Sequence, residues 1–122
     1  MDVKNKRVVV TGAASGIGKA LCEAFHQAEA KTVIAVDINL EGAQDTADSV
    51  NGIAVQANVG NEEEIINVIQ KADEHAGGTD IFCSNAGIGG VPGFFEVGAS
   101  DWKNIWDVNV QSHIFAAKHV LP

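Results

Sequence analysis

Four short apolar runs alternate with amphipathic helical patterns along this chain, and the alternation limits the fold more than any other feature. The runs lie at residues 7–11, 32–36, 53–57 and 81–83, and apolar residues at helical spacing follow each one. Strands joined through helices pair in parallel, because each right-handed crossover returns the chain to the same edge of the sheet. The order βαβαβαβα therefore predicts an α/β doubly wound fold, in which helices cover both faces of a parallel sheet.

Each expected helix carries a start or stop signal. Asn39 and Asn61 are typical N-caps, and the glycine pair 77–78 ends the third helix. Ser100 or Asp101 is expected to begin the last one. The apolar residues at helical spacing are Ile17, Ala20, Leu21, Ala24, Phe25 and Ala28 in the first helix, Leu40, Ala43, Ala47 and Val50 in the second, Ile65, Ile66, Ile69 and Ala72 in the third, and Trp102, Ile105, Trp106, Val110 and Phe115 in the last.

Composition excludes several classes of protein. A chain of 122 residues with 46% hydrophobic content suits one domain. The net charge of -8 argues against nucleic-acid binding, which depends on clustered Lys and Arg. No apolar run approaches the roughly 18 residues of a membrane span, and no signal-peptide pattern begins the chain, so we expect a cytoplasmic protein.

The residues that commonly bind metals are scattered. Cys22 and Cys83 form no CxxC pair and are expected to be reduced core thiols. The acidic run 62–64 follows a helix cap, where the helix dipole favours negative charge, so we interpret it as structural. No metal site is predicted from the histidines, which show no metal-ligand spacing: His26, His75, His113 and His119.

The candidate chemistry begins at the turn TGAASGIG, residues 11–18, between the first strand and the first helix. A helix N-terminus offers free N–H groups and a positive dipole end to an anion, and a pyrophosphate commonly binds there. Glycine allows positive φ and close approach of a phosphate, and Gly18 also lets the helix pack closely on the strand. The spacing is GxxxGxG, and a glycine cluster of this kind also occurs in simple tight turns.

Asp37 is the second candidate, 19 residues beyond Gly18 at the end of the second strand. A carboxylate there can accept hydrogen bonds from the ribose hydroxyls of an adenosine. It would repel a 2′-phosphate, and neither Ser15 nor Ile38 offers a compensating positive charge, so NAD is favoured over NADP. Asp37 also suits a capping role at the start of the second helix.

Several motifs together resemble the N-terminal half of the classical short-chain dehydrogenase/reductase family. They are TGAASGIG at 11–18, Asp37, Asn58-Val59, SNAG at 84–87 and the helix pattern from Trp102 to Asn109. The resemblance covers essentially the whole chain. It implies an NAD-binding Rossmann-type domain over residues 1–122, with strand order 3-2-1-4 and truncated before the later strands. It also implies reversible hydride transfer between nicotinamide and a secondary alcohol or ketone.

The resemblance assigns roles to individual residues. Asn58 and Val59 would meet the adenine, with Asn58 standing where the family more often has Asp. Asn109 matches the family's active-site asparagine, which interrupts a long helix and holds a water, although an Asn there also suits an exposed helix position. The residues expected to bind the cofactor are Gly12, Ser15, Gly16, Ile17 and Gly18 at the pyrophosphate, Asp37 and Ile38 near the ribose, Asn58 and Val59, and Asn85, Ala86 and Gly87 beneath the cofactor.

Two of these positions leave alternatives open. Ser84 replaces the Asn that is commoner in the family. Asn85 equally suits a structural turn residue that bonds its own backbone.

The family's catalytic Ser, Tyr and Lys have no counterparts in this chain, which contains no Tyr. His113 and His119 would need a different active-site geometry to replace the Tyr. We therefore expect the 122-residue chain alone to be inactive, marginally stable and at best a weak NAD binder. Its fourth strand would present an unpaired edge that favours self-association.

Three functional hypotheses remain. The chain is part of a complete NAD-dependent oxidoreductase, a non-catalytic NAD-binding or regulatory module, or an interaction protein with a vestigial Rossmann fold. The first implies a small alcohol or ketone substrate, for which the loop 88–98 could supply an apolar wall from Val91, Phe94 and Phe95. It also implies a homo-dimer or homo-tetramer, with Trp102, Trp106 and Phe115 at or beneath the interface.

Overall fold

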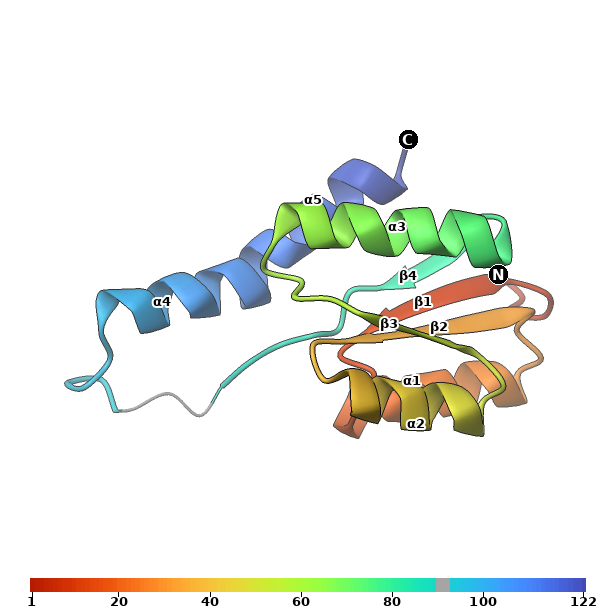
Figure 1. Ribbon diagram of the computed structural model, residues 1–122, viewed down its shortest axis with the longest axis horizontal. Helices are drawn as coiled ribbons and strands as arrows, with labels where there is room; N and C mark the ends of the chain where they lie inside the picture. The colour runs from red at the N-terminus through yellow and green to blue at the C-terminus, as the bar shows by residue number, and fades with distance from the viewer. Residues whose placement is uncertain (90–92) are drawn as a thin grey trace.

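A computed structural model describes residues 1–89 and 93–122, and its four strands form one parallel sheet (Figure 1). The strand order is β3-β2-β1-β4, so the fold and strand order predicted from the sequence are confirmed. β1 is the central strand, and its Val9 lies between Ile34 of β2 and Phe82 of β4. The strands are β1 (Arg7–Thr11), β2 (Thr32–Asp37), β3 (Ile53–Gln56) and β4 (Ile81–Cys83).

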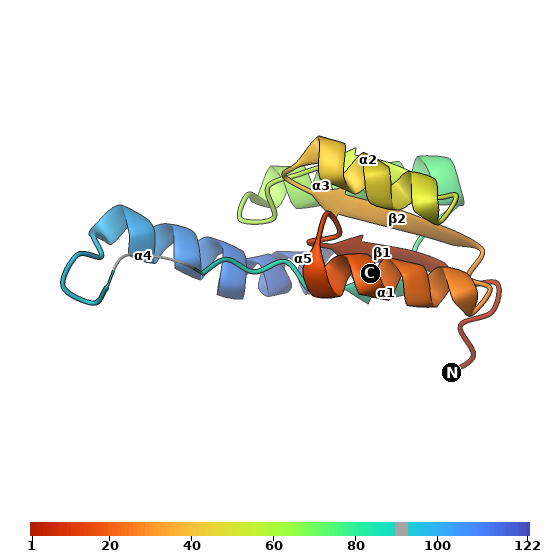
Figure 2. The same ribbon diagram turned by 90° about the horizontal axis from the view of Figure 1, so that it is seen from below.

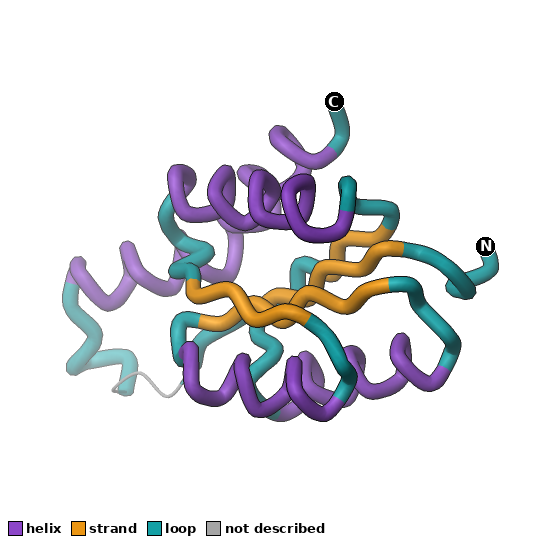
Figure 3. Tube along the Cα trace, turned by 45° about the vertical axis from the view of Figure 1, so that its right-hand side comes forward, coloured by secondary structure: helices purple, strands orange, loops and turns teal. Residues whose placement is uncertain are grey.

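The helices form a layer on each face of the sheet. α1 and α2 cover one face, and α3 covers the other, with α5 packed against α3 (Figures 1 and 3). α4 extends away from the sheet, as the view from below shows (Figure 2). The helices are α1 (Gly16–Gln27), α2 (Leu40–Ser49), α3 (Glu62–Ala76), α4 (Ala99–Trp106), a π-helix η1 (Asp107–Gln111) and α5 (Ser112–Val120).

The valine run of β1 is buried on both faces, as its continuous apolar pattern predicts. Val8 and Val10 pack with Cys22 and Ala47 on the side of α1 and α2. Val9 packs with Ile34, Val36, Val68 and Ala72 on the side of α3. Because side chains alternate between the faces of a strand, three successive valines contribute to two cores at once.

The buried face of α1 differs from the predicted one. Gly18 and Cys22 are buried and Leu21 and Phe25 are half-buried, whereas Ile17 is 73% exposed. Residues at i, i+3, i+4 and i+7 share one face of a helix, so Gly18 sets the face that meets the sheet. The expected positions that are instead exposed are Ile17, Ala20, Ala24 and Ala28.

The other helix faces follow the prediction more closely. In α3, Ile65 and Ala72 are buried and Ile66 and Ile69 are half-buried, but the prediction missed Val68, which is also buried. In α2, Ala43 and Ala47 are buried and Val50 is buried just after the helix. Leu40 is exposed because it is the first residue of α2 and lies beyond the core.

The last helical stretch expected from the sequence is three segments, and the interruption that the family resemblance implies at Asn109 is the π-helix η1. α4 begins at Ala99 after the N-cap Gly98, and Asp101, instead of being the cap, accepts a hydrogen bond from the Gly98 N–H at 2.9 Å. The π-helix η1 then changes the register, so Val108 is buried while Val110 remains exposed.

Neither cysteine forms a disulfide, and the two thiols border the same core cluster. Burial raises the pKa of the Cys22 thiol to about 11 and also raises the pKa of Cys83, which favours the neutral thiols.

Among residues 1–89 and 93–122, no three His, Cys, Asp or Glu side chains gather as a metal site would require. In the same residues, no helix combines the length and apolar character that a membrane span needs.

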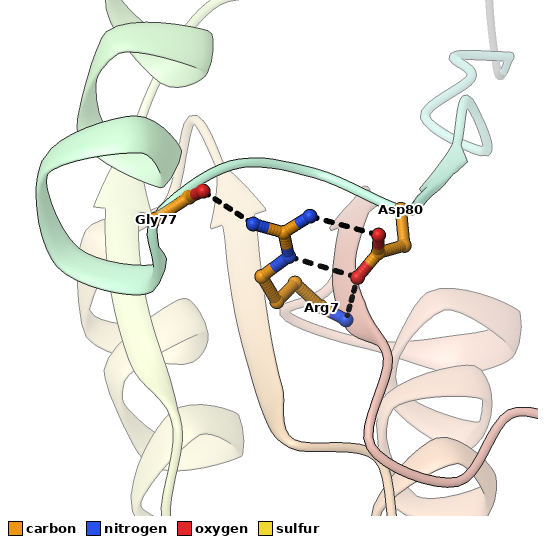
Figure 4. A network of polar contacts seen from close by, with 3 residues as sticks. All are labelled: Arg7, Gly77 and Asp80. Carbon is orange, nitrogen blue, oxygen red and sulfur yellow. Dashed lines mark hydrogen bonds and ion pairs between the residues drawn. The ribbon is translucent and has the colours of Figure 1, made fainter.

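Arg7 ties the start of β1 to the turn that precedes β4 (Figure 4). Its Nε and Nη2 donate to the two carboxylate oxygens of Asp80, each at 2.8 Å, and its Nη1 donates to the carbonyl of Gly77. The backbone N–H of Arg7 also donates to Asp80 at 2.8 Å. The side-chain hydrogen bonds from Arg7 hold the pKa of the Asp80 carboxyl well below its usual range.

Replacing this carboxylate should destabilise the fold in a pH-dependent way. A carboxyl whose pKa is lower in the folded state contributes stability above its unfolded pKa of about 3.9, and that stability is lost as pH falls through the folded pKa. We expect Asp80→Asn to lower the melting temperature by a few degrees at pH 7, and the difference to narrow progressively as pH falls below about 4 toward the lowered pKa of Asp80. Thermal unfolding monitored by circular dichroism measures it. Asp45→Asn, an exposed charge change on α2, is the control, and a pH-independent difference would contradict the prediction.

Candidate functional site

A groove of about 520 Å³ lies at the carboxyl ends of the strands. In a doubly wound sheet, ligands bind where the strand order reverses, here on either side of β1. All the residues predicted to bind a cofactor line this groove: Gly12, Ser15, Gly16, Ile17, Gly18, Asp37, Ile38, Asn58, Val59, Asn85, Ala86 and Gly87. Four further residues line the groove without having been predicted to bind the cofactor: Ala57, Ile88, Asn104 and Val108.

The turn between β1 and α1 needs its glycines for different reasons. A Cβ at Gly18 would overlap the carbonyl oxygen of Gly12, so only glycine permits this approach of helix to strand. Gly12 has φ +72° and Gly16 has φ +55°, a region that residues with a side chain seldom adopt. A Cβ at Gly16 would meet no atom within 4 Å, so Gly16 leaves open space beside the groove.

The N-terminus of α1 has no cap from its own chain. The side chain of the N-cap Ser15 forms no capping hydrogen bond, and the first turn holds no acidic residue. In contrast, Asn39 accepts from the Gly42 N–H at 3.1 Å, and Asn61 accepts from the Glu64 N–H at 3.3 Å. The positive end of the α1 dipole is therefore free to interact with an anion in the groove.

Asp37 lies at the end of β2, with each carboxylate oxygen held by one backbone group. Oδ2 accepts from the Ala14 N–H and Oδ1 from the Asn39 N–H, both at 3.0 Å. A carboxylate can accept several more hydrogen bonds, so Asp37 is fixed in place and still able to bind a ligand. Asn39 is the N-cap of α2, and Asp37 bonds to the N–H of that cap.

Thr11 joins the carboxyl ends of β1 and β4, a role that the sequence analysis missed. Its side chain is buried, and its Oγ1 accepts from the N–H groups of Asn85 and Ala86 at 3.0 and 3.1 Å. The same hydroxyl donates to the carbonyl of Cys83 at 3.3 Å. A single hydroxyl therefore positions the backbone that forms the floor of the groove.

Asn85 supports the same junction. Its Nδ2 donates to the carbonyl of Thr11 at 3.0 Å, so it bonds across the sheet and not to its own backbone. On the α2 side, the buried Thr46 donates to the carbonyl of Ala13 at 2.8 Å. Thr11 is the first residue of the motif TGAASGIG, but the pattern assigns no role to its hydroxyl, and Thr46 lies in no motif.

Asn58 follows β3, and both ends of the residue are held. Its Oδ1 accepts from the Gly60 N–H at 3.0 Å, and its own N–H donates to Oε1 of Glu64 at 3.1 Å.

Glu62 bonds to Lys118 at 2.7 Å and to His119 at 2.8 Å, joining α3 to α5. The hydrogen bond from Lys118, followed by that from His119, lowers the pKa of Glu62. These contacts support a structural interpretation of the acidic run 62–64.

Asn109 lies in the π-helix η1 and is not among the residues that line the groove. Its Oδ1 accepts from the Ile88 N–H at 2.8 Å, and its Nδ2 donates to the Ile88 carbonyl at 2.9 Å. The side chain thus bonds to the backbone N–H and C=O of one residue in the loop that follows β4. Nearby, Ser84 Oγ and His113 Nδ1 are 2.6 Å apart.

Residues 6–122 match the sequence model of the short chain dehydrogenase family. The chain belongs to that family. It is 34% identical over 126 residues to glucose 1-dehydrogenase 2 of Bacillus subtilis (strain 168), covering 98% of this chain and 49% of that protein. It is also 30% identical over 118 residues to a short chain dehydrogenase of Claviceps purpurea (strain 20.1), covering 93% of this chain and 45% of that protein.

Solved structures agree with this family assignment. A Burkholderia phymatum short chain dehydrogenase/reductase in complex with NAD has a TM-score of 0.94 at 25% identity, covering all of this chain and 45% of that one. A Brucella melitensis short-chain dehydrogenase/reductase described as a glucose/ribitol dehydrogenase has a TM-score of 0.91 at 28% identity, covering all of this chain and 53% of that one. The chain spans about half the length of these relatives.

The Thr11 hydroxyl can be tested by a pair of substitutions. Thr11→Val keeps the shape but leaves the Asn85 and Ala86 N–H groups without their acceptor, at a cost of about 1–3 kcal/mol for each group that stays buried. Thr11→Ser keeps the hydroxyl and loses one methyl, so we expect a smaller loss of about 1 kcal/mol. Chemical denaturation measures both free energies of unfolding. Equal losses for Val and Ser would contradict the assigned role.

Proposed function

We propose that this chain forms the NAD-binding half of a dehydrogenase that interconverts a secondary alcohol and a ketone. The observation that carries the proposal is the uncapped N-terminus of α1, which opens onto the groove beside Gly16 and across from the Asp37 carboxylate. A dinucleotide needs an anion site and a hydroxyl-binding carboxylate at this separation along the chain. The family and its relatives in complex with NAD or named as dehydrogenases support the same function.

The residues of the turn would hold the pyrophosphate through backbone N–H groups. Gly12, Ser15, Gly16, Ile17 and Gly18 all line the groove, and Gly16 places no side chain between the backbone and a phosphate. Ile17 projects into the same space, which accounts for its exposure. Asn85, Ala86 and Gly87 would form the floor beneath the cofactor, held at Thr11.

Asp37 favours NAD over NADP. It is the one charged side chain among the described residues that line the groove, and none of those residues is Lys or Arg. A 2′-phosphate beside Asp37 would meet a like charge without a compensating cation, whereas the ribose hydroxyls of NAD can donate to the carboxylate. Ile38 lies beside Asp37 and would pack on the adenosine.

Bound NAD would supply the hydride acceptor, and the protein would orient the substrate and move a proton. We propose that Asn109 belongs to the active site as a positioning residue, because its side chain bonds to the backbone N–H and C=O of Ile88, which lines the groove. By the family resemblance, Asn109 would also hold a water of the proton relay. The proton-transferring Tyr, the Lys that acts with it and the substrate-orienting Ser would come from sequence outside this chain.

Exposed aromatic residues support a substrate wall and an oligomer. Phe94 and Phe95 are highly exposed, with ring centroids 5.5 Å apart at 84°, and would form an apolar wall for a small alcohol or ketone. Val91, proposed for the same wall, lies outside the described residues. Trp102 and Trp106 on α4 are more than half exposed and would contact a second subunit of a homo-dimer or homo-tetramer. Phe115 on α5 packs against the buried cluster of Val59, Ile65 and Val108.

Two alternatives make different predictions. A non-catalytic NAD-binding module would bind NAD without turnover, and a vestigial interaction protein would show no stabilisation by NAD. Melting temperatures with and without NAD distinguish the interaction protein from the other two functions.

We propose that the enzyme is cytoplasmic, because NAD is available in that compartment.

The decisive test is the native reading frame beyond the codon for Pro122. We expect it to continue into a strand, a Ser and a Tyr-x-x-x-Lys segment, because an unassisted phenol with a pKa near 10 transfers protons poorly at neutral pH. Sequencing the transcript measures this directly. A stop codon immediately after Pro122 would exclude the proposed catalysis by this chain and leave only binding of NAD.

Replacing Asp37 should change cofactor preference. In the protein expressed from its complete reading frame, we expect Asp37→Asn to weaken NAD binding about tenfold, because a charged acceptor for the ribose is lost. Binding of NADP should improve relative to NAD, since the like charge is removed. Fluorescence titration gives both dissociation constants, and Asp45→Asn outside the groove is the matched control. An unchanged NADP-to-NAD ratio would contradict the assignment.

A further inference from the structure

The amide of Asn58 has a defined orientation. The Gly60 N–H lies 3.0 Å from Oδ1, and because an N–H can bond only to an acceptor, the oxygen of the amide must face Gly60. The NH₂ group therefore points the other way. None of the hydrogen bonds formed within residues 1–89 and 93–122 uses this Nδ2 as a donor. One of the two lone pairs of the amide oxygen is committed to the protein, and the NH₂ donor is free.

Asn58 holds this orientation at the wall of the groove. Its backbone N–H is fixed by Glu64 at 3.1 Å, and the neighbouring Ala57 and Val59 are buried. The apolar residues Ile38, Ala57 and Val59 line the same groove, and their side chains suit the faces of a flat ring. If the proposed function is correct, the purine of the cofactor lies here and Asn58 is the polar group nearest its edge.

From this orientation we propose that the base site of this protein accepts a 6-oxopurine dinucleotide at least as well as the 6-aminopurine dinucleotide NAD. This inference rests on the proposed function. The 6-amino group of adenine is a donor, so it cannot pair with the free Nδ2 and can reach only the lone pair that Oδ1 keeps beside the Gly60 bond. The 6-oxo group of hypoxanthine is an acceptor and pairs with Nδ2. Asn58 is thus a residue that determines base specificity.

An aspartate at this position would behave differently. One carboxylate oxygen would accept from the Gly60 N–H, as Oδ1 of Asn58 does now, and the second oxygen would remain free for a 6-amino group. The substitution Asn58→Asp therefore keeps the turn and reverses the hydrogen-bonding character of the free atom. The two side chains have nearly the same volume, so the substitution changes the hydrogen-bonding character of the free atom and leaves the shape of the side chain nearly unchanged.

The experiment compares two dinucleotides on two proteins. Dissociation constants for NAD and for nicotinamide hypoxanthine dinucleotide are measured by fluorescence titration, without turnover, on the protein expressed from its complete reading frame and on Asn58→Asp. We expect the wild type to bind the hypoxanthine dinucleotide as tightly as NAD or up to about tenfold more tightly, and Asn58→Asp to prefer NAD by about tenfold. Asn67→Asp, the same change on an exposed face of α3, should keep the wild-type ratio.

The outcomes separate this inference from the function on which it rests. A wild type that binds NAD at least tenfold more tightly than the hypoxanthine dinucleotide overturns the inference and leaves the proposed function intact. Failure of the wild type to bind either dinucleotide overturns both. The melting temperatures of Asn58→Asp and Asn67→Asp report whether these variants fold. If Asn58→Asp does not fold, the ratio of the two dissociation constants of the wild type is sufficient for this decision.

Discussion

The close approach of α1 to the end of β1 is the constraint on which the rest of the structure depends. Because Gly18 rests against the Gly12 carbonyl, the rotation of α1 about its axis is set from its first turn. Leu21, Cys22 and Phe25 then meet the sheet, and Ile17 is directed into the groove. The same contact points the helix N-terminus at the groove. Packing and binding therefore share one steric requirement, which only glycine satisfies.

A second constraint holds the floor of the groove. The carboxyl ends of β1 and β4 are joined by the Thr11 hydroxyl and the Asn85 amide, which satisfy backbone groups that no strand ladder can reach. A half-satisfied polar network in such a position would cost more than an apolar contact. With every bond made, the floor of the groove is as firmly placed as the strands. Asn85, Ala86 and Gly87 lie outside the regular elements, and these bonds fix them to the end of β1.

The sequence predicted the elements and the lining of the groove because both depend on local order along the chain. Strand ends that follow one another through right-handed crossovers must meet at one edge, so Asp37, Asn58 and Asn85 were brought together by topology alone. The rotation of α1 and the π-helix at Asn109 depend on distances between elements, and periodicity carries no such information. The roles of Thr11 and Thr46 were missed for the same reason, since a hydroxyl that bonds a distant backbone leaves no pattern.

The N-terminal ends of the helices show how one physical effect gives two outcomes. At α3, Asn61 and the acidic run 62–64 occupy the positive end of the helix dipole. Glu64 also joins α3 to Asn58, which follows β3, and Glu62 joins α3 to α5. At α1, the first turn carries no acid and its N-cap forms no side-chain bond, so the corresponding charge is left for a ligand. The N-termini of both helices lie near the same edge of the sheet. What would direct an anion to α1 is therefore the absence of carboxylates in its first turn, together with the space that Gly16 leaves open.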